Sequence, residues 1–218
     1  RIYDWVKNKK RRYSKLNQNY QLLIEYDGSK FVGWQIQKNG LSIQESVEKA
    51  LKKLIKKNIL LVGSGRTDAG VHALEQSANF KTEYKIKNKN NFIKSFNFFL
   101  FKDSISILDI KKKSNMFHSR FSATKRSYKY FIINREAPTV LNKNRAWHIR
   151  KKLDINLMKK GAKVLSEIKD FSTFRASSCS AKSPIKKLEK IKITKKSNKI
   201  KILFISKSFL QNQVRSMV

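Results

Sequence analysis

The chain alternates short runs rich in β-branched and aromatic residues with amphipathic helical stretches, and this order restricts its fold more than any other feature. An apolar run at 20–26, closed by Asp27-Gly28, predicts a buried strand. Apolar residues at helical spacing follow Ser42, and Ser42 with Glu45 has the form of a capping box. The following elements are strands, a helix and a strand, and a similar cycle then repeats. This order predicts an α+β fold with two related halves.

The expected elements divide the chain into three parts. Residues 1–18 are polar and basic, which predicts an extension outside the packed fold; residues 19–113 form the first half and residues 114–218 the second. The other expected strands span 59–62, 76–80, 105–110, 128–133, 185–193 and 200–209, and the other expected helices span 91–100, 154–168 and a stretch that starts near Leu210. Residues 117–124 are expected to form a loop or a strand edge.

The charge balance of the chain is extreme, with 50 Lys and Arg residues against 15 Asp and Glu residues and a formal net charge of +35. Such a field attracts polyanions, and nucleic acid is the commonest of them. Only 11 of the basic residues are Arg and 39 are Lys, many of them in stretches rich in Lys, Asn and Ile. A lysine-rich solvated surface is therefore an alternative source of part of the charge. The magnitude of the charge nevertheless favours nucleic-acid binding.

Several classes of protein are excluded by what the sequence lacks. Cys179 is the single cysteine, so an intramolecular disulfide and a cysteine-cluster metal site are excluded. The three histidines (His72, His118 and His148) are far apart, so no zinc site is expected. No apolar run approaches the roughly 20 residues of a membrane span, and no apolar region follows the basic N-terminal run. We expect a cytoplasmic protein without a membrane partner, a metal or another cofactor.

Residues 63–72, Gly-Ser-Gly-Arg-Thr-Asp-Ala-Gly-Val-His, form a glycine-rich loop between two expected strands. Its glycine spacing does not fit a dinucleotide-binding fingerprint, and it lacks the Gly-Lys-Ser/Thr ending of a P-loop. Gly65 and Gly70 permit sharp turns, and Arg66 and Asp68 are two positions apart. An Arg beside an Asp favours the ionised carboxylate that a nucleophile or general base requires. On spacing alone, a structural Arg–Asp pair accounts for this loop better than catalysis does.

A resemblance to a known family favours catalysis over a structural Arg–Asp pair. The stretch Gly63–Ala73 resembles the signature of the tRNA pseudouridine synthase A family. Five other blocks resemble the same family in the same order, namely Glu25–Gln35, Ser42–Glu45, Phe117–Tyr130, Asp170–Arg175 and Phe209–Arg215. The resemblance therefore extends from about residue 20 to the end of the chain.

Two departures from the family pattern carry expectations of their own. Leu100-Phe101-Lys102-Asp103 stands where the family has Leu-Pro before an acidic residue, which predicts a local change in that loop. Members of the family also continue past the block that contains Arg215 with further sheet and helix. We therefore expect this chain to be a partial sequence or an incomplete domain.

The resemblance implies a pseudouridine synthase fold, with antiparallel sheets flanking a basic RNA-binding cleft, and an isomerase without a cofactor. Asp68 would be the catalytic carboxylate, which attacks C1′ or C6 of the target uridine or deprotonates the sugar to give a glycal. Arg66 would fill the stack left by the flipped base, Tyr128 would stack on the flipped uracil, and Arg215 would pair with the catalytic carboxylate. Arg126, Arg120 and the lysines would hold the RNA backbone.

The substrate that the resemblance implies is tRNA, at positions 38, 39 and 40 of the anticodon stem-loop, bound by a homodimer with the RNA lying across both subunits. Asp68, Arg66, Tyr128 and Arg215 should then converge on one cleft. Two alternatives stay open, a non-catalytic RNA-binding protein that relies on charge and a methyltransferase that uses the glycine-rich loop as a cofactor cradle. A methyltransferase loop should precede a helix, whereas a strand is expected at 76–80 here.

Overall fold

The computed structural model describes residues 18–218, so all but the last residue of the basic extension expected at 1–18 lies outside the described residues. The chain divides into two units, the first ending at Ala123 and the second beginning at Thr124. The sequence pattern predicts this division after residue 113 instead. Segment 114–123 belongs with the first unit because the side-chain amide of Asn19 donates to the carbonyl oxygens of Ser114 (2.8 Å) and Phe117 (2.9 Å).

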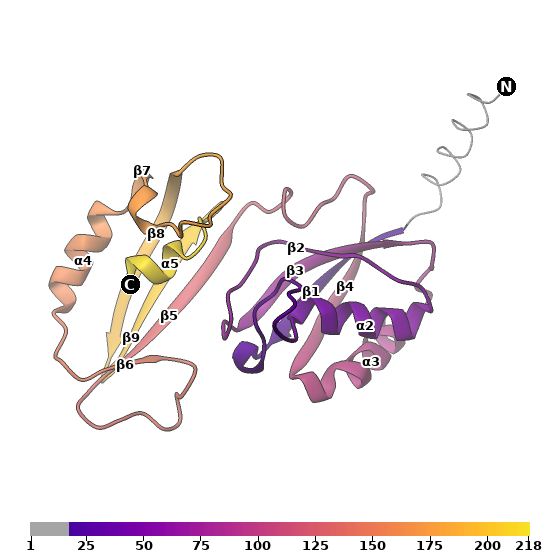
Figure 1. Cartoon of the computed structure of the whole chain (residues 1–218), viewed down its shortest axis with the longest axis horizontal. Coiled ribbons are helices and arrows are strands. Elements are labelled where there is room, and N and C mark those ends of the chain that lie inside the picture. Colours follow the sequence, from indigo (N-terminus) through magenta and orange to yellow (C-terminus); the bar gives the residue numbers. More distant parts are fainter. Residues whose placement is uncertain (1–17) are drawn as a thin grey trace. The chain divides into compact units, whose positions relative to one another are not determined.

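The first unit is a four-stranded antiparallel sheet in the order β2-β3-β1-β4, with two helices packed against one of its faces (Figure 1). Its elements are β1 (Gln18–Tyr26), α2 (Ile43–Ile55), β2 (Leu61–Gly63), β3 (Ala73–Thr82), α3 (Lys89–Leu100) and β4 (Ile105–Lys113), with short 3-10 turns at Gly28–Lys30 and Phe101–Asp103. The second of these turns contains the departure from the Leu-Pro pattern. Strand β1 begins at Gln18, which the sequence pattern assigns to the basic extension.

The core of the first unit lies between the sheet and its two helices. Alternate residues of β1, among them Leu22 and Ile24, are fully buried on the helix side, as expected for a strand with one covered face. Helix α2 begins as the capping box predicts, because the Ser42 hydroxyl accepts a hydrogen bond from the Glu45 backbone N–H (3.2 Å). The Glu45 carboxylate itself pairs with Lys49 on the next turn (2.6 Å).

The second unit is a five-stranded sheet in the order β6-β5-β9-β8-β7. Its elements are β5 (Arg126–Asn134), β6 (Trp147–Ile149), α4 (Ile155–Val164), β7 (Glu167–Asp170), a 3-10 turn at Ser172–Phe174, β8 (Ile185–Lys196), β9 (Lys199–Ser206) and α5 (Gln213–Met217). Strands β5 and β6 pair in parallel, and the other neighbours are antiparallel. The sequence pattern gives no indication of β6.

Helix α4 is shorter than its periodicity predicts. Its start is the expected one, because the Asp154 carboxylate caps the N–H groups of Asn156 (2.8 Å) and Leu157 (3.0 Å). The expected helix runs to residue 168, but the observed one ends at Val164, and β7 begins three residues later and pairs with β8. The prediction was wrong at this end because pairing with a strand from a later part of the sequence overrides a local helical pattern.

Buried apolar side chains are fewer in the second unit. Four of them form one cluster, Ile132, Ile200, Ile202 and Phe204, and Phe171, Leu188 and Leu210 form another. Helix α4 has no fully buried side chain, and its Ile155 and Met158 are only partly covered where they pack on the first of these clusters.

Candidate active site

The glycine-rich loop connects two antiparallel neighbours in the sheet of the first unit. Strands β2 and β3 pair from Leu61 opposite Phe80 to Gly63 opposite Ala78, and residues 64–72 form the connection between them. Strand β3 therefore follows the loop directly, as the sequence predicts. A cofactor loop of a methyltransferase would lead into a helix, so the arrangement contradicts that alternative.

Hydrogen bonds from three different segments fix the loop on both sides of Arg66. The Tyr26 hydroxyl lies 2.8 Å from the Thr67 hydroxyl, and the Trp34 backbone N–H donates to the Thr67 carbonyl oxygen (3.0 Å). The Gln76 side-chain amide donates to the Gly65 carbonyl oxygen (2.7 Å). The residue directly before Asp68 is therefore held through both its side chain and its backbone.

Gly33 is required for this close contact between the loop and the segment that follows the 3-10 turn at Gly28–Lys30. Its φ of +116° is unfavourable for any residue with a side chain, and a Cβ atom there would lie 2.7 Å from the Thr67 carbonyl oxygen. Within the loop, the backbone bends at Gly65 and turns at Gly70, as the sequence predicts, and Gly70 adopts a positive φ of 75°.

The far end of the loop is joined to the turn after β1. The Gly28 backbone N–H donates to His72 Nδ1 (3.1 Å), and an Asp27 carboxylate oxygen lies 3.1 Å from the same nitrogen. His72 is therefore a structural part of the loop, with no metal-binding arrangement around it. No group of three or more His, Cys, Asp or Glu side chains within residues 18–218 is arranged to hold a metal ion.

Asp68 is half-buried and Arg66 is exposed. Within residues 18–123 no ion pair joins these two side chains, although they are two positions apart. The loop is held instead by Tyr26, Gln76 and backbone contacts. The structure therefore contains no Arg66–Asp68 ion pair that would explain why these two residues occur in the loop. The Asp68 carboxylate is not neutralised by Arg66.

The second unit carries the other expected site residues. Arg126 and Tyr128 lie two positions apart on β5, so their side chains project from the same face of the sheet. The Tyr128 ring packs edge-on against Phe209, with centroids 5.1 Å apart and planes at 88°, and Arg126 donates to the Lys207 carbonyl oxygen. Arg215 is exposed on α5.

The same unit brings these three residues to one region. The neighbours of Arg215 on α5, Val214 and Met217, pack in the apolar cluster that Tyr128 and Phe209 also join. Arg66 and Asp68 belong to the other unit, and the convergence of all these residues on one cleft stays a prediction.

Sequence reasoning missed the residues that position the loop, chiefly Tyr26 and Gln76. Tyr26 lies in a block that resembles the family, but a tyrosine at the end of a buried strand has the pattern of a core residue. Gln76 lies in an expected strand, and its contact with Gly65 depends on how the loop folds back over β3. No signal in the sequence gives that geometry.

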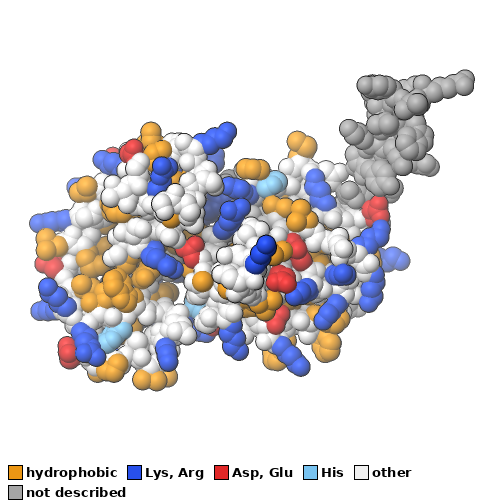
Figure 2. Space-filling view, in the orientation of Figure 1, with side chains coloured by type: hydrophobic (Ala, Val, Ile, Leu, Met, Phe, Trp, Pro, Cys, Tyr) orange, Lys and Arg blue, Asp and Glu red, His pale blue; other side chains and the backbone are white. Residues whose placement is uncertain are grey.

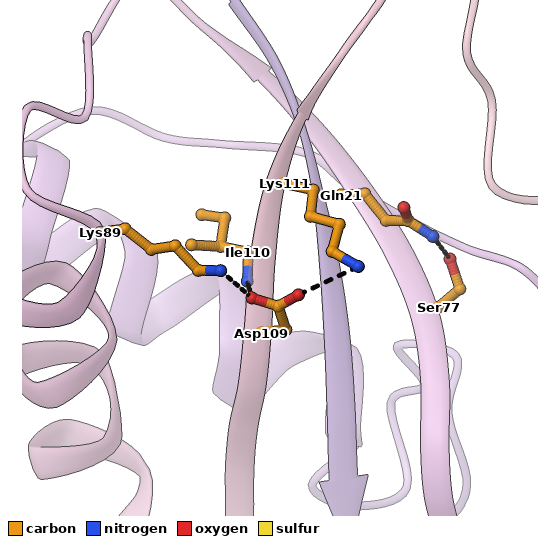
Figure 3. A network of polar contacts seen from close by, with 6 residues as sticks. All are labelled: Gln21, Ser77, Lys89, Asp109, Ile110 and Lys111. Atoms are coloured by element: carbon orange, nitrogen blue, oxygen red, sulfur yellow. Dashed lines mark hydrogen bonds and ion pairs between the residues drawn. The ribbon is translucent and has the colours of Figure 1, made fainter.

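A charged cluster on β4, the edge strand farthest from β2 in the sheet, has a structural role (Figure 3). The Asp109 carboxylate pairs with Lys89 at the start of α3 (2.5 Å) and with Lys111 (3.4 Å), and it accepts the Ile110 backbone N–H (2.8 Å). The hydrogen bond from Lys89 is the main cause that holds the pKa of Asp109 below its usual value, although partial burial opposes it. This cluster joins the N-terminus of α3 to the edge of the sheet.

Lys and Arg side chains are spread over the face of the molecule that Figure 2 shows, between hydrophobic and uncharged groups. Their distribution suits a broad attraction for a polyanion, which does not by itself select a sequence. No helix within residues 18–218 is long and apolar enough to cross a membrane.

Comparison with known proteins shows which family this chain resembles. A family model described as tRNA pseudouridine synthase matches residues 168–218, in the second unit. The chain is 57% identical over 199 residues to a protein named tRNA pseudouridine synthase A from Pelagibacter ubique (strain HTCC1062). Proteins with the same name from Ehrlichia canis (strain Jake) and Anaplasma marginale (strain Florida) are 43% and 41% identical over 205 and 207 residues. Each match covers 91% of this chain and 81% of the relative.

The mixed α/β fold with antiparallel sheets and the matches to these relatives thus define a pseudouridine synthase, which is an isomerase. More narrowly, the chain belongs to the tRNA pseudouridine synthase A family. This membership favours an enzyme over a non-catalytic RNA-binding protein.

Proposed function

We propose that this chain converts uridine to pseudouridine at positions 38, 39 and 40 in the anticodon stem-loop of tRNA. In this isomerisation the bond between uracil N1 and ribose C1′ breaks, and a bond between C5 and C1′ forms. The hydrogen at C5 is lost and N1 gains one, so the product has the same composition as the substrate. The reaction needs a well-placed carboxylate and consumes no second substrate.

The observation that carries this proposal is the placement of Asp68. Its loop is fixed through Thr67 and Gly65, and its carboxylate has no ion pair with Arg66. A carboxylate that remains available on a preorganised loop suits a nucleophile or a general base. Asp68 acts on the sugar or on the uracil ring of the flipped nucleotide, and Arg66, exposed two positions before it, occupies the space that this nucleotide leaves.

The second unit supplies contacts to the substrate. Tyr128 stacks on the flipped uracil, and its edge-on packing against Phe209 supports a fixed ring orientation for that role. Arg215 keeps the catalytic carboxylate ionised, because a cation close to a desolvated acid favours the charged form. Arg126 holds a phosphate of the RNA backbone.

Recognition of three adjacent uridines depends on the shape and charge of the stem-loop, because no single pattern of base edges is common to these positions. The formal net charge of +35 supports tight binding to the RNA backbone with a strong dependence on salt. The enzyme acts in the cytoplasm as a homodimer, with the tRNA lying across both subunits.

Mapping pseudouridine along a tRNA transcript after incubation with the chain tests this proposal. We expect the modification at positions 38, 39 and 40 where these are uridines, and at no uridine outside the stem-loop. A matched transcript with cytidine at those three positions is the control and should remain unmodified. Modification elsewhere in the tRNA, with none at these positions, would reject the proposed specificity.

A further inference from the structure

Segment 114–123 displays an aromatic ring that the proposed mechanism does not use. The Phe121 side chain is 75% exposed, although large apolar side chains are usually covered. The imidazole of His118 lies against the Phe121 ring, with centroids 4.4 Å apart and planes at 34°. The Arg120 guanidinium lies 5.7 Å from the centre of the same ring. The exposed ring is thus supported by a second ring and accompanied by a cation.

The backbone that carries Phe121 is held by a buried polar network. The Asn79 side chain donates to the Asn19 side-chain oxygen (3.0 Å) and accepts the Ser119 backbone N–H (2.8 Å). Asn19, Asn79 and Ser119 are all nearly inaccessible to solvent. Overlapping turns, in which the backbone N–H groups of Phe121 and Ser122 donate to the His118 carbonyl oxygen, close the segment. A satisfied buried network of this kind rigidifies the segment that it holds.

The same network reaches the loop that contains Asp68. The hydroxyls of Ser119 and Ser77 lie 3.4 Å apart, and Ser77 also accepts a hydrogen bond from the Gln21 side chain (2.8 Å; Figure 3). The Ser77 carbonyl oxygen accepts the Ser64 backbone N–H (2.8 Å). Asp68 follows Ser64 by four residues, so their Cα atoms are at most about 14 Å apart. The segment that carries Phe121 and the start of the loop that carries Asp68 therefore both contact the same residue of β3, Ser77.

We propose that Phe121 is a stacking platform for an unpaired nucleobase of the RNA substrate, close to the target uridine. This inference rests on the proposed function, because it assigns a further contact to the same substrate. A rigid exposed aromatic ring binds a base without a large loss of side-chain entropy, and any of the four bases offers a face to it. Arg120 adds attraction for the phosphate beside that base. Such a contact suits an enzyme that accepts several neighbouring positions, since stacking tolerates changes in sequence.

Binding measurements on the full chain test this platform without any need for turnover. The probe is an anticodon stem-loop RNA with cytidine at positions 38, 39 and 40, which is not a substrate. We expect Phe121→Ala to weaken binding of this RNA about 5- to 150-fold, the range that corresponds to the loss of one stacked base. Phe121→Trp should bind within about 3-fold of the wild type because it keeps a stacking face. Phe98→Ala is the matched control, because Phe98 is 79% exposed on α3, and it should leave binding unchanged.

A series of RNAs with one abasic nucleotide at each loop position identifies the base. At one loop position, removal of the base should weaken binding of the RNA to the wild type. The same removal should cause no further loss of affinity for the Phe121→Ala variant. The dependence of binding on salt should be the same for Phe121→Ala and the wild type, because a stacking contact releases no counterion.

Equal RNA binding by Phe121→Ala and Phe98→Ala would overturn the platform, as would a change in oligomeric state for Phe121→Ala without a change in RNA binding. If the wild type forms no pseudouridine in a uridine-containing tRNA but Phe121→Ala still weakens binding, the proposed function fails and the platform stands. The two failures are therefore distinguishable.

Discussion

The two units of the chain bury apolar side chains to very different extents. Within residues 18–123, the first packs 21 of them in one cluster between a four-stranded sheet and two helices. The second has four in one cluster and three in another, and many more that are only partly covered. The loop with Asp68 belongs to the well-packed unit, whereas Arg126, Tyr128 and Arg215 belong to the other. In the proposed function, the catalytic carboxylate thus belongs to the unit with the larger buried core, and Arg126, Tyr128 and Arg215 belong to the unit with the smaller clusters.

Replacement of an apolar helix side chain by Ala should give the largest difference in stability loss between the two units. Leu51 on α2 is fully buried, whereas Met158 on α4 is only partly covered. We expect Leu51→Ala to lower the free energy of unfolding of the first unit by about 2–5 kcal/mol. Met158→Ala should cost the second unit less than about 2 kcal/mol, because less contact is lost.

Native-state hydrogen exchange, which reports each unit separately, is the measurement for these truncations. Losses of equal size in the two units would contradict the difference in packing.

The same glycine substitution should have opposite effects in the two units. Gly33→Ala should destabilise the first unit by about 1–3 kcal/mol and slow catalysis, because the backbone is left-handed there and the added Cβ meets the Thr67 carbonyl oxygen. Gly161 lies inside α4, and a Cβ there would meet nothing within 4 Å. Gly161→Ala should therefore stabilise the second unit by about 0.5–1 kcal/mol.

Urea unfolding and the rate of pseudouridine formation test this pair of variants. A Gly33→Ala enzyme with the stability and rate of the wild type would refute the close contact between Gly33 and the loop.

The charged cluster on β4 should have the smallest effect, and one that depends on pH. The folded-state pKa of Asp109 lies below its unfolded value, so its stabilisation is fully present above about pH 4 and is lost as the pH falls through the folded pKa. At pH 7, Asp109→Asn should cost about 0.2–1 kcal/mol, because both lysine partners are largely exposed.

Urea midpoints at pH 7 and pH 3 check the sign, with Glu75→Gln, at an exposed position on β3, as the control. The difference between Asp109→Asn and the wild type should shrink at pH 3. A difference that grows on acidification would show that the ion pairs do not stabilise the fold.

Local patterns in the sequence predicted most of the elements, because the apolar run in β1 and capping by Ser42 and Asp154 act over a few residues. They did not predict β6 or β7, which exist through pairing with strands elsewhere in the sequence. The boundary between the units lies later than the sequence predicts for the same reason, because Asn19 forms a hydrogen bond with Ser114, 95 residues later in the sequence.

The candidate site likewise has features that the sequence predicts and contacts that it does not. A resemblance in the sequence predicts the roles of Asp68 and Arg66, and the glycine-rich loop lies where it was expected. The contacts from Tyr26 to Thr67 and from Gln76 to Gly65 could not be predicted, because they depend on the three-dimensional path of the loop over the sheet. A strand pattern predicts on which face of the sheet a side chain lies, but not which loop atom that side chain contacts.

Replacement of one carboxylate oxygen tests the central claim most directly. Asp68→Asn should reduce the single-turnover rate of pseudouridine formation at saturating tRNA by at least about 10³-fold, because the catalytic carboxylate is lost while the shape of the side chain is kept. The affinity for tRNA should stay within about 3-fold of the wild type, because phosphate contacts dominate binding. A variant that binds tRNA normally and turns over at the wild-type rate would contradict the assignment of the chemistry to Asp68.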